Sequence, residues 1–253
     1  MVSNMDSAEK AARRYEKALQ AVSAKAAAAA PQHDTDVPYA WIRLNRKRYP
    51  RLPSIALPDA ETNAVSLANA LSARKSVRTF GGPLTLQDLA NVLGEAARAR
   101  RDDSWSRPYP SAGARNAVEW YALTAAGGMK DLPGGTYHYD PDQHALDVLN
   151  DADPGGLLKG LIANQPISVP PVLIVLTILL HRTCVKYGGR GLRFAYLEAG
   201  AAAMAANLSG QTHGLVCCWL GGFDDRLLAS ALDVSLDLHL EVPVLGLTLG
   251  RPA

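Results

Sequence analysis

The hydrophobic positions of this chain follow a strand-like pattern in some segments and a helix-like pattern in others. An unbroken run of β-branched and leucine residues over 172–179 predicts a central strand that is covered on both faces. The turn-prone letters DPDQ separate two of the shorter strand-like runs. The segments that predict strands are 118–124, 136–139, 145–149, 172–179, 215–220 and 242–249.

Helix-like segments lie between these strands. Residues 66–75 predict a short helix, and Thr85 begins a second one because the letters TLQD form a T-x-x-D cap. Residues 191–213 predict the longest helix, whose small residues favour close packing against another helix or a neighbouring subunit. A further short helix is predicted over 224–232. The mixture predicts an α+β fold in which helices pack around a mainly antiparallel or mixed sheet.

Residues 1–59 differ from the rest of the chain. Residues 8–30 are rich in helix formers but poor in large apolar residues, so they predict a helical leader with little core to bury. Such a leader would be an appendage, a partner-contacting arm or a weakly packed segment. Residues 31–58 are proline-rich and irregular, which is typical of an extended connector across a surface. The main domain is therefore predicted to span 60–253.

Composition and charge indicate a globular protein and argue against a nucleic-acid-binding or membrane-spanning one. A chain of 253 residues with 48% hydrophobic content can bury a substantial core. Its net charge of +2 lacks the basic excess of nucleic-acid-binding proteins. The longest apolar run, 170–180, is shorter than the ~20 residues of a membrane span, and the N-terminus has no signal-peptide pattern. Three cysteines without a disulfide or zinc spacing favour a reducing compartment, so we expect a cytoplasmic protein without nucleic-acid, membrane or metal partners.

Two segments carry residues suited to binding a phosphorylated, flat ligand. The letters ARKSVRTFGG place Arg74, Lys75, Ser76 and Arg78 at a helix end, where charge-assisted hydrogen bonds can surround a phosphate. A solvated basic helix end would show the same letters. The segment RPYPSAGARNAVEWY, 107–121, joins a proline-stiffened loop to small residues that allow close approach of a backbone to a ligand. An ordinary loop with a serine cap is the alternative.

A polar segment, KYGGRGLRF over 186–194, lies between the central strand and the longest helix and predicts a loop. An exposed lysine with a tyrosine packed beneath it would be its purely structural explanation. His138 and His144 have no third ligand at metal spacing and are expected to be surface residues with satisfied hydrogen bonds. Glu198 is expected to pair with a neighbouring arginine of its own helix, Arg190 or Arg193.

Several motifs occur together in one order: R-x-S-x-R-x-F, PSAGA leading into a strand with E-x-Y, G-x-Y-x-Y-x-P-x-x-H-x-L, KYG-x-R-x-x-R, GGFDD and LGRP. This series resembles the nitroreductase superfamily of flavin enzymes. More narrowly, it is similar to the SagB-type dehydrogenases, the azoline oxidases of thiazole and oxazole biosynthesis. The resemblance covers about residues 66–252. It implies a nitroreductase-like FMN-binding fold and a homodimer with the flavin at its interface.

The resemblance also implies roles for individual residues. Lys186 and Tyr187 match the catalytic Lys-Tyr pair of azoline oxidases. Arg115 and Asn116 stand where the family commonly has an apolar-Tyr-Pro run, and together with Arg190 they are expected to contact substrate. The residues implied to bind FMN are Arg74, Lys75, Ser76, Arg78, Pro110, Ser111, Ala112, Gly113, Gly221, Gly222 and Arg251.

The implied reaction needs a base as well as a flavin. Dehydrogenating an azoline to an azole removes a hydride and a proton from adjacent ring atoms, so Lys186 or Tyr187 would take the proton. The expected function is therefore FMN-dependent dehydrogenation of a peptide-derived or carrier-bound azoline, with a cyclodehydratase or peptide synthetase as the expected partner. The alternatives are an NAD(P)H-dependent nitro or quinone reductase and a non-catalytic subunit of a peptide-modifying complex.

Overall fold

A computed structural model describes residues 46–253 apart from 101, 104, 164 and 235–240. The predicted helical leader, 8–30, lies outside the described residues. A seven-stranded sheet in the order β1-β4-β3-β2-β5-β7-β6 forms the centre, and each neighbouring pair of these strands is antiparallel. The strands are β1 (Ser54–Ala56), β2 (Val118–Thr124), β3 (Gly135–Asp140), β4 (Ala145–Asn150), β5 (Val172–Leu179), β6 (Val216–Leu220) and β7 (Glu241–Gly250).

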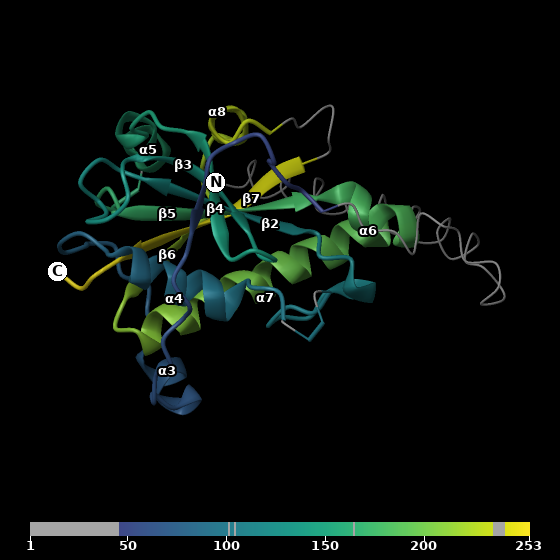
Figure 1. The fold of residues 1–253 in the computed structure, drawn as a ribbon, viewed down its shortest axis with the longest axis horizontal. Coiled ribbons are helices and arrows are strands. Elements are labelled where there is room, and N and C mark those ends of the chain that lie inside the picture. Colours follow the sequence, from purple (N-terminus) through teal and green to yellow (C-terminus); the bar gives the residue numbers. More distant parts are fainter. Residues whose placement is uncertain (1–45, 101, 104, 164, 235–240) are drawn as a thin grey trace, which may run out of the picture.

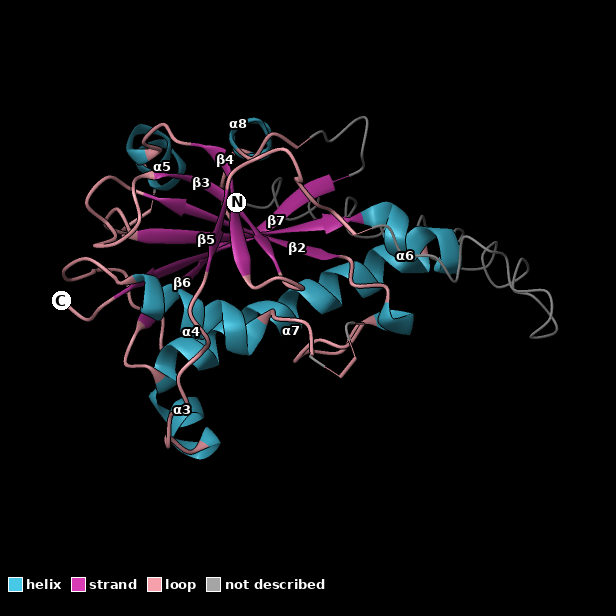
Figure 2. Cartoon of the chain, viewed as in Figure 1, coloured by secondary structure: helices cyan, strands magenta, loops and turns pink. Residues whose placement is uncertain are grey.

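Helices cover both faces of the sheet (Figure 1). Figure 2 shows α4 and α7 on one face and α5 and α8 on the other. The buried side chains form two clusters that match this division, one under α4 and α7 and one under α5 and α8. The helical segments are α3 (Leu67–Ala73), α4 (Leu86–Ala96), the 3-10 turn η2 (Ala112–Ala114), α5 (Gly155–Ile162), α6 (Leu180–Tyr187), α7 (Arg190–Thr212) and α8 (Asp225–Ala231). The α+β prediction is confirmed.

The local signals explain why several elements form where they do. Every residue of β5 is buried, as its unbroken apolar run predicts. At the start of α4, the Thr85 side chain accepts a hydrogen bond from the Asp88 N–H, and the Asp88 carboxylate accepts one from the Thr85 N–H. This capping box satisfies two backbone donors that a helix start leaves open. None of the helices in the described part of the chain has the length and hydropathy of a membrane-spanning segment.

The predicted connector takes part in the sheet. Ser54–Ala56 pairs with β4, so the prediction of an irregular segment over 31–58 is wrong for these residues. Just before it, the Lys47 ammonium lies 2.6 Å from the Glu241 carboxylate at the start of β7. The sheet therefore includes residues that precede position 60, and the domain boundary at that position stays a prediction.

The segment 186–194 is not a loop. Lys186 and Tyr187 form the last turn of α6, and Arg190 begins α7, so Gly188 and Gly189 alone join the two helices. Gly188 has φ 54°, a conformation that favours glycine, and its N–H donates to the Cys184 carbonyl to end α6. The sequence shows no apolar helical stripe here, because the buried side chains of α6 are Arg182 and Thr183.

Gly191 and Gly200 lie on the same helix and allow a matched pair of substitutions. A Cβ at Gly191 would lie 2.6 Å from the Cys184 backbone nitrogen, whereas a Cβ at Gly200 would meet no described atom within 4 Å. We expect Gly191→Ala to lower the free energy of unfolding by about 1–3 kcal/mol, because α6 and α7 must separate. Gly200→Ala should raise it by about 0.5–1 kcal/mol, because alanine favours helix. Urea denaturation measures both, and equal losses in the two variants would contradict this packing.

Candidate active site

The predicted flavin-binding loop lies directly against the predicted catalytic pair. Gly113 in η2 has φ 60°, and a Cβ at this position would lie 2.5 Å from the Tyr187 hydroxyl and 3.2 Å from Lys186 Nζ. The backbone conformation favours glycine, and a side chain at this position would have to displace the ends of both Tyr187 and Lys186. Two segments that are far apart in the sequence meet at this point.

The sheet explains this meeting. Val118 at the start of β2 is paired with Ile178 near the end of β5, and the Leu179 N–H donates to the Ala117 carbonyl over 2.8 Å. The loop that precedes β2 and the helix that follows β5 consequently lie at the same end of the sheet. We call this the lysine end; it comprises 110–116 and 180–190.

Reciprocal hydrogen bonds tie the loop to α6. Arg115 Nε donates to the Arg182 carbonyl over 2.6 Å, and Arg182 Nη1 donates to the Asn116 carbonyl over 2.5 Å. Both arginines and Asn116 are buried. Arg115 and Asn116 thus hold Lys186 and Tyr187 in place through the helix that carries them. Arg190, the third predicted substrate contact, is the exposed first residue of α7.

Glu198 supports the same loop from α7. It accepts hydrogen bonds from Ser111 Oγ at 2.7 Å and from the Val118 N–H at 3.3 Å. The prediction that Glu198 pairs with Arg190 or Arg193 is therefore wrong, because its side chain faces the sheet and is buried. Burial raises the pKa of Glu198, and the bond from Ser111 partly offsets this effect.

A buried chain of charges lies beneath the lysine end. The Arg182 guanidinium is 2.5 Å from the Glu119 carboxylate, which is 2.9 Å from His138 Nε2; His138 Nδ1 is 3.3 Å from Asp147. Burial alone would raise the pKa of Glu119, but the charges of Arg182 and His138 hold it at about 2. Burial would lower the pKa of His138, but its two carboxylate partners raise it instead. The expectation of a surface histidine is wrong here, since His138 is fully buried.

His144 also lies in the interior rather than on the surface. Its Nδ1 is 2.7 Å from the Tyr139 hydroxyl and its Nε2 is 2.9 Å from the Pro58 carbonyl. Its hydrogen bonds are satisfied, as expected. Its buried position differs from the surface position that was expected. Burial lowers the pKa of His144.

The predicted phosphate-binding residues gather at the opposite end of the sheet. Ser76 forms a bridge with Cys217 of β6, and the Gly81 N–H donates to the Arg251 carbonyl over 2.9 Å. Arg74, Lys75, Ser76 and Arg78 are exposed, as a site for an anion from solution requires. The Arg251 guanidinium lies at the same end but donates to the Asp88 carboxylate over 2.7 Å. We call this the phosphate end; it comprises 74–81 and 250–252.

Gly221 and Gly222 lie between these two ends. They follow β6, whose last residue is paired with Gly246 in the middle of β7. Both are exposed, and a Cβ at Gly221 would meet no described atom within 4 Å. The Gly222 carbonyl accepts from Gln165 Nε2 over 2.8 Å, whereas the Gly221 backbone is open to a ligand.

One chain does not bring its two ends together. The phosphate end lies by Val172, where β5 begins opposite Leu249, and the lysine end follows Leu179, where β5 ends opposite Glu241. Eight strand residues separate them by roughly 25 Å. Figure 1 shows the same separation, with α6 at one extreme of the sheet and the C-terminus at the other.

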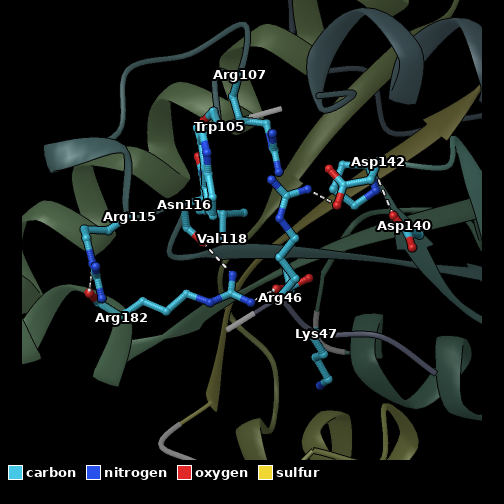
Figure 3. Close-up of a pocket in the computed structure, with 12 residues that line it drawn as sticks. Arg46, Lys47, Trp105, Arg107, Arg115, Asn116, Val118, Asp140, Asp142 and Arg182 are labelled. Carbon is cyan, nitrogen blue, oxygen red and sulfur yellow. Dashed lines mark hydrogen bonds and ion pairs between the residues drawn. The ribbon is translucent and has the colours of Figure 1, made fainter. Parts of the chain in front are cut away.

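A pocket at the lysine end contains residues that the sequence does not identify as functional. Figure 3 shows Arg46 and Arg107 projecting into it between Trp105 and Asp142. The Arg46 guanidinium lies 4.6 Å from the Trp105 ring centroid and pairs with Asp142. No local sequence motif predicts this pocket, because its wall is built from the connector, a loop, a turn and α6, which are far apart in the sequence.

Comparison with family models decides the family. The model described as "Nitroreductase family" matches residues 71–251, which is most of the chain. The chain belongs to the nitroreductase family. The matched residues include the lysine end and, up to Arg251, the phosphate end. The part of the chain that belongs to this oxidoreductase family therefore contains all the site residues predicted from the sequence.

Individual relatives agree with this nitroreductase assignment. The chain is 26% identical over 166 residues to the microcin B17-processing protein McbC of Escherichia coli, a match that covers 64% of this chain and spans 60% of that protein. A putative nitroreductase of Ralstonia eutropha matches with a TM-score of 0.68 and 26% identity over 86% of this chain and 99% of its own. The E. coli microcin synthetase McbBCD complex with truncated pro-MccB17 matches with a TM-score of 0.63 and 20% identity, covering 88% and 85% of the two chains.

The residues of this nitroreductase-family chain fit a flavin mononucleotide. An exposed group of three cations and a serine suits its phosphate, and the small residues of the 110–113 loop allow its backbone to approach a flat ring closely. Arg74, Ser76 and Arg78 would hold the phosphate, while the 110–113 loop would lie along the ring.

The Arg182–Glu119 pair offers a test of how α6 is held. Arg182→Met leaves the Glu119 carboxylate buried without its guanidinium, so we expect the free energy of unfolding to fall by about 3–5 kcal/mol. Adding Glu119→Gln should restore much of this loss, because the buried carboxylate that lost its guanidinium is no longer charged. Urea denaturation of the two single variants and the double variant measures the effect. Strictly additive losses would show that the pair does not couple α6 to β2.

Proposed function

We propose that this chain is an FMN-dependent oxidoreductase that dehydrogenates an azoline ring to an azole in a peptide-derived product. The observation that carries the proposal is the contact of Gly113 with the Lys186–Tyr187 pair. This contact puts a potential proton acceptor against the loop that would lie along a flavin ring. Similarity to a microcin-processing protein and the KYG-x-R-x-x-R motif favour a peptide-derived substrate.

The chain's own residues would perform the proton transfer. When bound, the flavin supplies the acceptor for the hydride that leaves the ring. Lys186 Nζ or the Tyr187 hydroxyl would take the proton from the adjacent ring carbon. The two groups are held together, because Lys186 Nζ lies 5.5 Å from the Tyr187 ring centroid and Phe194 packs edge-on against that ring at 5.0 Å. The anchoring of α6 by Arg182 fixes their distance from Gly113.

The proposed enzyme is a homodimer whose flavin sites each combine the phosphate end of one copy with the lysine end of the other. Exposed apolar side chains near both ends support this arrangement. Leu67 and Leu71 of α3 are 64% and 49% exposed, and Tyr196 and Leu197 of α7 are 47% and 65% exposed. Apolar side chains that project in this way favour burial against another protein surface.

The proposed substrate arrives attached to a peptide or a carrier. A cyclodehydratase or a peptide synthetase would supply the azoline, because the proposed reaction starts from a ring that has already closed. Similarity to a microcin-processing protein favours these partners, and three cysteines without a disulfide spacing favour a cytoplasmic location. The nearest competing function is reduction of nitro or quinone compounds by a nicotinamide cofactor.

Anaerobic mixing of the FMN-loaded protein with a thiazoline-containing peptide tests the reaction. We expect the flavin absorbance to bleach and the peptide to lose two mass units of hydrogen, at about one equivalent per flavin. Lys186→Ala should slow bleaching by about 10²–10⁴-fold while FMN stays bound, because only the proton acceptor is lost. Lys159→Ala, on the surface of α5, is the matched control and should react like the unchanged protein.

Two outcomes would contradict the proposal in different ways. Rapid bleaching by NADPH without any reaction with the peptide would identify a nicotinamide-dependent reductase. Protein that stays colourless after incubation with FMN would identify a non-catalytic subunit. If the flavin of the Lys186→Ala variant bleached at the unchanged rate, Lys186 would not be the proton acceptor.

A further inference from the structure

The pocket at the lysine end is lined by an excess of positive charge. Its wall includes five cationic side chains, Arg46, Lys47, Arg107, Arg115 and Arg182, and three carboxylates. Three of the cations already pair with carboxylates: Arg46 with Asp142, Arg182 with Glu119, and Lys47 with Glu241. Among the described residues the lining carries more cations than carboxylates, and an anion would complement this excess.

The guanidinium groups also crowd one another. Burial and then the nearby charges of Arg107 and Arg48 lower the pKa of Arg46. Figure 3 shows the Arg107 and Arg46 side chains converging on the same space, with Arg115 and Arg182 along one side. A negatively charged group in this space would relieve the repulsion between like charges.

Two buried polar atoms of the lining have no hydrogen-bond partner among the described residues. They are Arg182 Nε, a donor, and Asn116 Oδ1, an acceptor, and their residues are 5% and 7% exposed. The Asn116 amide cannot be flipped, because its Nδ2 donates to the carbonyls of Trp105 and Ala114. A buried donor or acceptor without a partner destabilises the protein, so this pair points to a ligand that supplies both an acceptor and a donor.

We propose that this pocket binds a carboxylate of the substrate together with the amide N–H next to it, as found at an acidic or C-terminal residue of a peptide. The carboxylate accepts from the guanidinium groups, and the N–H donates to Asn116 Oδ1. The inference rests on the proposed function, because it assigns the pocket to the residue that flanks the ring. Arg115 joins the two sites: it lines the pocket, and its Nε donates to the Arg182 carbonyl of α6, the helix that ends with Lys186 and Tyr187.

Small probes test the pocket without any turnover. N-acetylglycine carries a carboxylate beside an amide N–H, N-acetylglycinamide lacks the charge, and N-acetylsarcosine lacks the N–H. Calorimetric or NMR titration of the full-length, FMN-loaded protein should show N-acetylglycine binding about tenfold or more tightly than either of the others, because charge-assisted hydrogen bonds are the strong ones.

Two variants locate the binding. Arg107→Gln should weaken N-acetylglycine about tenfold and leave N-acetylglycinamide unchanged, while Arg107→Lys should keep part of the preference. Arg226→Gln removes an exposed guanidinium from α8 and changes the net charge equally, so it should have no effect. Equal binding of all three probes, or equal losses in Arg107→Gln and Arg226→Gln, would overturn the proposal.

Rates of peptide oxidation distinguish failure of the pocket assignment from failure of the proposed azoline oxidation. Two thiazoline peptides that differ only in a carboxylate or carboxamide beside the ring should differ about tenfold in kcat/KM, and Arg107→Gln should abolish the difference. Oxidation of both peptides at the same rate would contradict the pocket assignment while confirming azoline oxidation. Failure to oxidise either peptide would refute the proposed function, and the probe titration would still decide what the pocket binds.

Discussion

The buried guanidinium of Arg182 is the interaction on which the candidate site depends. It pairs with Glu119 of β2 and donates to the Asn116 carbonyl, while its own carbonyl accepts from Arg115. These bonds hold α6 against the start of β2. Since α6 carries Lys186 in its last turn, the same bonds set the position of the lysine relative to the loop. A buried charge is costly unless its partners are fixed, so the network favours one arrangement of these elements.

The sheet imposes the second constraint, because it separates the residues suited to a phosphate from those suited to proton transfer. Antiparallel pairing puts the start of β2 beside the end of β5, and puts the end of β7 beside the start of β5. One end of the molecule therefore presents exposed cations to solvent, whereas the other presents the partly buried Lys186–Tyr187 pair. The proposed flavin site built from two copies of the chain follows from this division, and the apolar side chains exposed near both ends support it.

The sequence predicted those parts of the fold that depend on local signals. The apolar run of β5, the capping box at Thr85 and the positions of the main strands could all be found because each signal lies within one segment. Helix α6 escaped prediction because its buried face includes Arg182, whose partners come from elsewhere in the chain. The burial of His138 was missed for the same reason: its carboxylate partners lie on neighbouring strands. The contact of Gly113 with Lys186 agrees with the family motifs, but the pocket beside it needed the structure, since no motif joins Arg46 to Arg182.

The assembly of one site from two copies is the central claim, and a complementation measurement tests it most directly. Arg78→Ala damages the phosphate end and Lys186→Ala damages the lysine end, so each homodimer should be inactive. A heterodimer isolated with two different affinity tags should contain one intact and one doubly damaged site, and we predict that it regains about half of the unchanged protein's rate of azoline oxidation. A heterodimer as inactive as its parents would show that each site lies within a single chain, and would contradict the account.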